Sequence, residues 1–213
     1  VLRCYGGRHG LGSYLGIGGE WQLAGPILDS YATDILAGFG GLTGQALQAG
    51  DSFDITPRYN TKIGLGAMLP PKSTQIRIHA APHAALLPKD TIVNFINHSW
   101  HVSPNSNRMG TRLLSDECDI SHDVSLPSMA VAPGCIQLPP NGEPIVLLND
   151  AQTTGGYPLR GTVIEADLRH FAQLKPGDFL HFKFVTLKEA HAAQEKLTAH
   201  LNQLAIALNY INK

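Results

Sequence analysis

The sequence carries a distinctive polar stretch at residues 149–158, Asn-Asp-Ala-Gln-Thr-Thr-Gly-Gly-Tyr-Pro. Asp150 supplies a potential acid or base. Neutral hydrogen-bonding groups surround it in the sequence: Gln152, Thr153, Thr154 and Tyr157. The Gly155–Gly156 pair permits a backbone turn whose N–H donors could bind an anion. An ordered turn with self-satisfied side chains is the alternative interpretation, and residue types alone do not decide between the two.

A second polar stretch, residues 104–113, contains two arginines four positions apart, Arg108 and Arg112. In a strand or loop we expect both on one face, where their forked donors would suit a carboxylate or phosphate. Asn107 adds an amide beside them. The alternative is that both arginines bind neighbouring acidic or carbonyl groups.

The elements around these stretches are mainly short strands. The patterns predict strands at 75–79, 135–138, 145–148, 162–166 and 179–184, separated by Gly, Pro and Asn turns. This spacing indicates a barrel or sandwich. The 149–158 stretch directly follows an apolar strand, so we expect it at a strand end, where barrels present their sites.

The chain divides at a Gly- and Pro-containing connector, residues 58–74. Residues 1–57 are predicted to be a β-rich segment, and residues 75–213 a barrel that ends in a helix from 187 onward. A helix is also expected to start at Asp90 or Thr91. The glycine cluster at 38–44 fits neither a dinucleotide fingerprint nor a Walker loop, and a structural turn is the favoured interpretation.

One short pattern occurs twice: Leu-x-x-Gly-Asp at 47–51 and again at 174–178. Each copy precedes an alternating segment, so each is predicted to be a turn that leads into a strand.

Composition excludes several function classes. Sixteen Lys and Arg balance seventeen Asp and Glu, which leaves no electrostatic footprint for nucleic acid. No window is apolar enough for a membrane span. Three cysteines and ten histidines show no metal-ligand spacing, so we predict no metal site and a cytoplasmic protein with free thiols. The chain begins at Val1 without an initiator Met, which we interpret as a fragment of a longer protein.

Residues 106–113 and 149–158 resemble the hallmark stretches of the family formed by the C subunits of 5-oxoprolinase, also called biotin-dependent carboxyltransferase-like, KipA-like or allophanate hydrolase subunit 2-like. Residues 33–44 and 173–178 are similar to it as well. The resemblance runs through essentially the whole chain, without the family's N-terminal portion. It implies a mainly β fold with a cyclophilin-like β-barrel, a small β-rich N-terminal segment and a C-terminal helix.

The resemblance further implies a protein that works with two other subunits of 5-oxoprolinase, one of the KipI-like B type and one of the A type. Together they would open 5-oxo-L-proline to L-glutamate with hydrolysis of ATP to ADP and phosphate, and the complex would bind the ATP. We expect this chain alone to be inactive. From residue chemistry, the expected catalytic groups are Asp150, Arg108 and Arg112. The expected substrate-binding residues are Asn107, Gln152, Thr153, Thr154, Gly155, Gly156 and Tyr157.

Two other functions are compatible with the same resemblance. One is a KipA-type regulatory protein that antagonises an inhibitor of a sensor kinase. The other is a carboxyltransferase-like domain of a urea amidolyase system, which would need a biotin carrier. No residue distinguishes a lactam from urea as substrate.

Overall fold

The computed structural model describes residues 14–21, 25–56, 72–116, 120–171 and 173–211. These fall into two compact units, one within residues 14–67 and one within residues 68–213. Most of the predicted connector, 58–74, lies outside the described residues.

The smaller unit has little regular structure in its described part. Strands β1 (Glu20–Trp21) and β2 (Ile55–Thr56) pair antiparallel, and Trp21 stacks on Phe53 with ring centroids 4.9 Å apart. Many of its large apolar side chains are exposed, among them Leu15, Leu28, Tyr31, Leu36 and Leu47.

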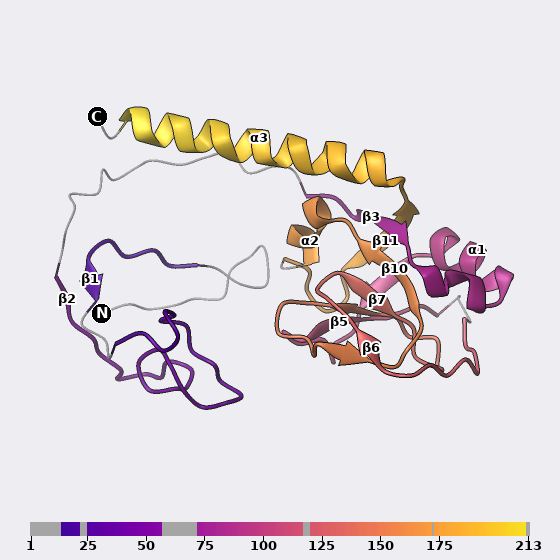
Figure 1. Cartoon of the computed structure of the whole chain (residues 1–213), viewed down its shortest axis with the longest axis horizontal. Coiled ribbons are helices and arrows are strands. Elements are labelled where there is room, and N and C mark those ends of the chain that lie inside the picture. The colour runs from indigo at the N-terminus through magenta and orange to yellow at the C-terminus, as the bar shows by residue number, and fades with distance from the viewer. Residues whose placement is uncertain (1–13, 22–24, 57–71, 117–119, 172, 212–213) are drawn as a thin grey trace. The chain divides into compact units, whose positions relative to one another are not determined.

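A closed barrel forms the centre of the larger unit (Figure 1). Among the described residues its strand order is β10-β3-β11-β4-β5-β8-β7. The strands are β3 (Gln75–Ala80), β4 (Trp100–Val102), β5 (Gly110–Leu114), β7 (Cys135–Gln137), β8 (Ile145–Leu147), β10 (Leu159–Val163) and β11 (Phe179–Phe184). Neighbours are antiparallel except β11 and β3, which run parallel. The strand pattern predicted a barrel or a sandwich, and the family resemblance implied a mainly β barrel, which is therefore confirmed.

The barrel interior is filled by alternate strand residues, as expected for strands with one face in a core. Ile76, Ile136, Val146 and Leu180 are fully buried there. Helix α1 (Lys89–Asn97) adds Phe95, which stacks on Phe182 with centroids 4.7 Å apart. A short 3₁₀ helix, η1 (Pro82–Leu86), connects β3 to α1. Strands β6 (Met129–Ala130) and β9 (Thr154–Gly155) pair separately.

The strand predicted at 162–166 is wrong in its second half. Strand β10 ends at Val163, and helix α2 (Glu165–Phe171) begins two residues later. The cause is a long-range contact, because Asp167 on α2 binds Arg77 on β3. A short sequence window does not contain this partner.

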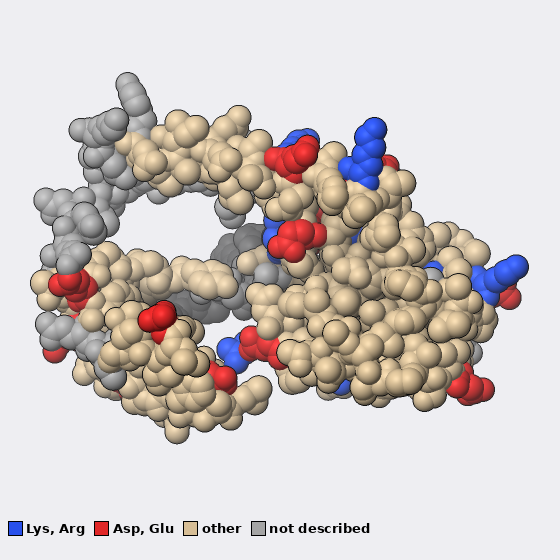
Figure 2. Space-filling model, viewed as in Figure 1, with Lys and Arg blue, Asp and Glu red and all other residues tan. Residues whose placement is uncertain are grey.

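The C-terminal helix α3 (Leu187–Ile211) is confirmed and packs against α2 and β3. Leu197 and Leu204 are half-buried, whereas Leu201 and Leu208, on the same predicted apolar face, are 53% and 47% exposed. The sequence from 197 to 211 carries no Lys, Arg, Asp or Glu, and Figure 2 shows the uncharged half of this helix.

Candidate active site

The two polar stretches leave the barrel at the same end. Strands β5 and β8 are antiparallel neighbours in which Gly110 lies opposite Leu147, so the start of one meets the end of the other. The Leu148 N–H donates to the Met109 carbonyl at 3.0 Å and continues this pairing beyond the strands. We call this end, where β5 begins and β8 ends, the loop end of the barrel.

Arg108 and Asp150 meet at the loop end. Arg108 Nε lies 3.0 Å from Asp150 Oδ2, and the side chains are 68% and 41% exposed. An ion pair this exposed contributes little to folding stability, because water screens it and two long side chains must be ordered. A substrate or partner can therefore reach both charged groups at small cost to the fold.

Asn107 and Arg112 have different surroundings. Asn107 Oδ1 accepts hydrogen bonds from the N–H groups of Met109 and Gly110, at 2.9 and 3.3 Å, so its side chain holds the turn that presents Arg108. Arg112 is exposed on the outer face of β5 between buried Thr111 and Leu113. Within the described part of the chain, no ion pair or hydrogen bond joins its guanidinium to residues 149–157.

The expectation that the two arginines share one face was made for a single strand or loop that contains both. Arg108 instead lies in the turn before β5, closed by the bridge between Asn107 and Gly110. Strand alternation therefore does not relate the two side chains. The structure brings Arg108 to Asp150 and leaves Arg112 on the strand.

Beyond Asp150, the chain returns along the outside of β7 before entering β10. The Thr153 carbonyl accepts a hydrogen bond from the Val131 N–H at 2.9 Å, and Thr154–Gly155 pair with Met129–Ala130. Gln152, Thr153 and Thr154 are exposed, and Tyr157 is 44% exposed. These polar groups therefore lie along the outside of the barrel, from Asp150 at the loop end toward the opposite end of the barrel.

The glycine pair does not form the turn that the sequence predicted. Gly155 is a residue of strand β9, and neither Gly155 nor Gly156 has a positive φ. A Cβ at Gly155 would overlap the Gln137 Nε2 atom, so a larger residue at this position would require the Gln137 amide to shift. A Cβ at Gly156 would lie 3.2 Å from the Leu126 carbonyl oxygen.

Gln137 is a residue of this site that the sequence interpretation missed. It is 2% exposed in β7, and its Oε1 accepts a hydrogen bond from Gln152 Nε2 at 3.3 Å. Its own Nε2 is buried and has no hydrogen-bond partner in the part of the chain that the structure describes. An amide placed inside the apolar segment 135–138 is the sequence signal that could have identified it.

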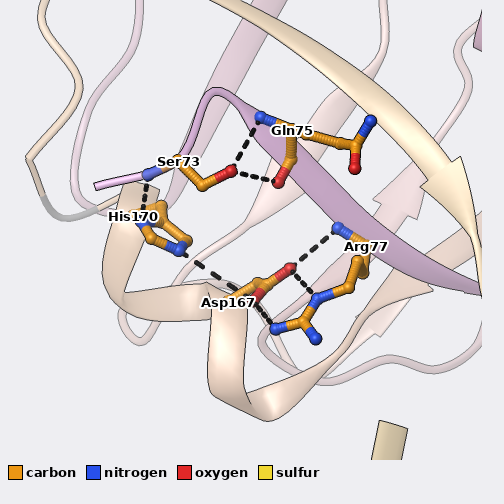
Figure 3. Close-up of polar contacts among 5 residues, drawn as sticks. All are labelled: Ser73, Gln75, Arg77, Asp167 and His170. Atoms are coloured by element: carbon orange, nitrogen blue, oxygen red, sulfur yellow. Dashed lines mark hydrogen bonds and ion pairs between the residues drawn. The ribbon is translucent and has the colours of Figure 1, made fainter. Parts of the chain in front are cut away.

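A second polar cluster joins α2 to β3 (Figure 3). Asp167, 2% exposed, accepts hydrogen bonds from Arg77 Nε at 3.0 Å and from Arg77 Nη2 at 2.6 Å. The Arg77 backbone N–H also donates to it, at 2.8 Å. This hydrogen bonding raises the pKa of Arg77. Both oxygens of Asp167 are engaged with Arg77, so we assign the cluster a structural role.

His170 completes that cluster. The Ser73 N–H donates to His170 Nδ1 at 3.4 Å, and His170 Nε2 lies 3.9 Å from Asp167 Oδ1. Burial, with a smaller contribution from Arg169, lowers the pKa of His170. The ring accepts a hydrogen bond at Nδ1, as a neutral imidazole can.

Neither a metal nor a phosphate cradle is evident in what the structure describes. No group of three or more His, Cys, Asp and Glu side chains could hold a metal ion there. In the glycine cluster at 38–44, the N–H groups of Gly38 and Gly44 donate to the carbonyls of Asp34 and Gly40. Gly40 and Gly44 take positive φ against nearby backbone, as a structural turn requires. We therefore derive no ATP-binding step from these glycines.

Comparison with known proteins shows the family to which this chain belongs. The family model described as carboxyltransferase domain, subdomain A and B, matches residues 1–184. The chain belongs to this carboxyltransferase-domain family. The C subunit of Escherichia coli 5-oxoprolinase is 36% identical over 208 residues, which cover 96% of this chain and 66% of that protein. The chain thus spans about two thirds of that relative's length.

The chain is also similar, at lower identity, to parts of larger proteins. Urea amidolyase of Saccharomyces cerevisiae is 25% identical over 92% of this chain and 12% of its own length. The crystal structure of Kluyveromyces lactis urea amidolyase superposes with a TM-score of 0.68 over 85% of this chain and 13% of that one. At 22% identity this match shows the fold alone. In the described residues, no helix is long and apolar enough to span a membrane.

Proposed function

We propose that the chain is a C-type subunit of an ATP-dependent 5-oxoprolinase. The similarity to the C subunit of the Escherichia coli enzyme over 96% of the chain carries this proposal. The complex would convert 5-oxo-L-proline, ATP and water to L-glutamate, ADP and phosphate. Its other components would be subunits of the A type and of the KipI-like B type, with ATP bound by the complex and no activity in this chain alone.

The proposed reaction determines which kinds of catalytic group the site must contain. A lactam is stabilised by resonance, so its carbonyl must be activated before water can add. Transfer of the ATP γ-phosphoryl group to the carbonyl oxygen would do this, with ADP leaving. A first water would then add to the ring carbon and the carbon–nitrogen bond would break, which gives an acyl phosphate of glutamate. A second water would hydrolyse this acyl phosphate to L-glutamate and phosphate. Negative charge develops on oxygen throughout, and the ring nitrogen must gain a proton.

We assign these two needs to the ion pair at the loop end. Arg108 would stabilise the developing negative charge through its guanidinium. Asp150, held 3.0 Å from Arg108, would act as acid or base toward water and the ring nitrogen. Gln152, Thr153 and Tyr157 would orient the substrate. Arg112 receives no role in this step, because no ion pair or hydrogen bond joins its guanidinium to the 149–157 segment among the described residues.

Replacing Arg108 tests the assignment. In a reconstituted complex of all three subunits, Arg108→Ala is expected to lower 5-oxoproline-dependent turnover about 100-fold or more, as removal of a donor to a developing oxyanion does in other enzymes. Lys183→Ala, which removes an exposed cation from the outer face of β11, serves as the control and should leave turnover unchanged. Wild-type turnover in Arg108→Ala would remove Arg108 from the mechanism.

A KipA-type regulatory role is the second candidate. The exposed apolar side chains of the smaller unit favour it, because such surfaces mark binding to another protein. Binding to a KipI-like protein without 5-oxoproline-dependent ATP hydrolysis would support regulation. Lactam-dependent ATP hydrolysis by the assembled complex would support the hydrolase.

A further inference from the structure

Arg160 is a fully buried cation without a counter-charge among the described residues. Its side chain lies on β10 with 0% exposure, and no described residue forms a hydrogen bond with its Nε, Nη1 or Nη2 atoms. Desolvation lowers the pKa of Arg160, but a guanidinium stays protonated at any physiological pH. An ion buried without a partner costs several kcal/mol, roughly, so this position calls for a specific explanation.

Two aromatic side chains lie over the Arg160 guanidinium, but they do not satisfy its N–H donors. The guanidinium carbon lies 5.5 Å from the centre of the Phe95 ring and 5.3 Å from the centre of the Phe184 ring. Cation–π contacts of this kind act on the flat faces of a guanidinium. They do not satisfy the N–H donors at its edge, which are the groups that bind a carboxylate in a fork.

Arg160 lies far along the barrel from the ion pair of the candidate active site. Strand β10 begins at Leu159, opposite Gln137, whereas its last residues lie beyond Cys135 toward the loop end. The Leu159 N–H donates to His83 Nδ1 on η1 at 3.4 Å. Arg160 therefore belongs to the opposite end of the barrel, which η1 covers and which we call the cap end.

A groove opens beside the same helical cover. Its volume is about 610 Å³, and it is lined by Leu86, Leu87 and Pro88 together with residues 121–124. Leu87 follows η1 directly and also packs in the core that contains Phe95. The chain between β3 and α1 thus borders both the groove and the interior that holds Arg160.

We propose that the cap end of the barrel binds a small monocarboxylic acid, whose carboxylate pairs with the edge of the Arg160 guanidinium. A single negative charge matches the single buried cation. An apolar tail would suit the surrounding Phe95, Phe184 and Ile78, whereas a dianionic phosphate would leave excess charge in this apolar interior. Binding requires η1 and α1 to open toward the groove. This proposal does not depend on the hydrolase assignment.

The test compares two probes of nearly equal shape, isobutyrate and isobutyramide, on the whole chain by thermal unfolding and titration calorimetry. Isobutyrate should raise Tm in a saturable way, as a ligand specific to the folded state does, and isobutyramide should not. Equal responses to both probes, or no response to either, would overturn the proposal. A larger, saturable response to inorganic phosphate would overturn the choice of a carboxylate.

Two variants locate the effect. Arg160→Met replaces the cation by an apolar chain of similar length, so it should fold and should weaken isobutyrate binding about tenfold or more. Lys183→Met removes an exposed cation from β11, another strand of the barrel, and should bind isobutyrate like the wild type. Undiminished binding in Arg160→Met would overturn the proposal. If Arg160→Met fails to fold, the comparison of isobutyrate with isobutyramide on the wild-type protein still tests the proposal.

Discussion

At the scale of single residues, His170 makes the folding stability of the larger unit depend on pH. Its pKa is lowered in the folded chain by burial, whereas in the unfolded chain it takes the ordinary value of about 6.5. Between these two values the unfolded state binds more protons. The contribution of His170 to stability is therefore complete above about pH 6.5 and falls as the pH is lowered toward the folded pKa.

Replacement of this ring should remove that dependence. We expect His170→Gln to show a flatter fall in the free energy of unfolding between about pH 7 and pH 5 than the wild type does. Urea unfolding at several pH values measures the difference, and the other histidines cancel in the comparison. Parallel pH curves for the two proteins would contradict the assignment.

Gly155 is a second residue whose environment leads to a prediction. A methyl group at this position would overlap the Gln137 amide, so Gly155→Ala should displace Gln137 or strand β9 and lower the unfolding free energy by about 1–3 kcal/mol. Gly16→Ala is a suitable control, because nothing lies within 4 Å of the added atom there. Thermal unfolding of both variants checks the prediction, and an unchanged Tm in Gly155→Ala would contradict it.

Single residues also show where sequence interpretation fails. Asp150 and Arg108 were identifiable from their types, but their contact depends on the pairing of β5 with β8. Arg160 would be expected on the surface from its charge alone, because arginine is mostly exposed. Only the fold shows it inside the barrel.

At the scale of elements, the repeated Leu-x-x-Gly-Asp pattern predicted two similar turns, and the structure confirms them. Asp51 Oδ2 accepts a hydrogen bond from the Gln48 N–H at 2.7 Å, and Asp178 Oδ2 accepts one from the Lys175 N–H at 2.8 Å. Both preceding glycines, Gly50 and Gly177, have positive φ. The two turns lie in different units, so they form a matched pair for experiment.

Asp178→Ala should lower the Tm of the barrel because the turn leads directly into β11, a barrel strand. The lost hydrogen bond from the Lys175 N–H is expected to cost about 1 kcal/mol. Asp51→Ala removes the equivalent side chain from the smaller unit and should leave the barrel transition unchanged. Hydrogen exchange of the β11 amides separates the two effects, and equal protection in both variants would argue against this role of the turn.

Among the elements, the sequence predicted the central residues of the strands best. The segments at 135–138, 145–148 and 179–184 correspond to β7, β8 and β11, since alternation or an unbroken apolar run is a local signal. Helix α2 was missed because Asp167 is held by Arg77, ninety positions earlier in the chain. A short stretch of sequence cannot reveal a contact between two residues so far apart in the chain.

At the scale of the whole molecule, the larger unit has a buried core and the described part of the smaller unit exposes most of its large apolar side chains. The chain also spans only about two thirds of its Escherichia coli relative. In the proposed function, an assembled complex would carry out catalysis, and this chain would contribute the Arg108–Asp150 pair.

A double-mutant cycle on the reconstituted complex tests that assignment most directly. Turnover of 5-oxoproline is measured for the wild type, Arg108→Ala, Asp150→Ala and the double variant. If the pair acts as a unit, each single variant loses about 100-fold and the double variant loses little more, because one replacement already disables the pair. Wild-type turnover in either single variant, or losses that simply multiply in the double variant, would contradict the account.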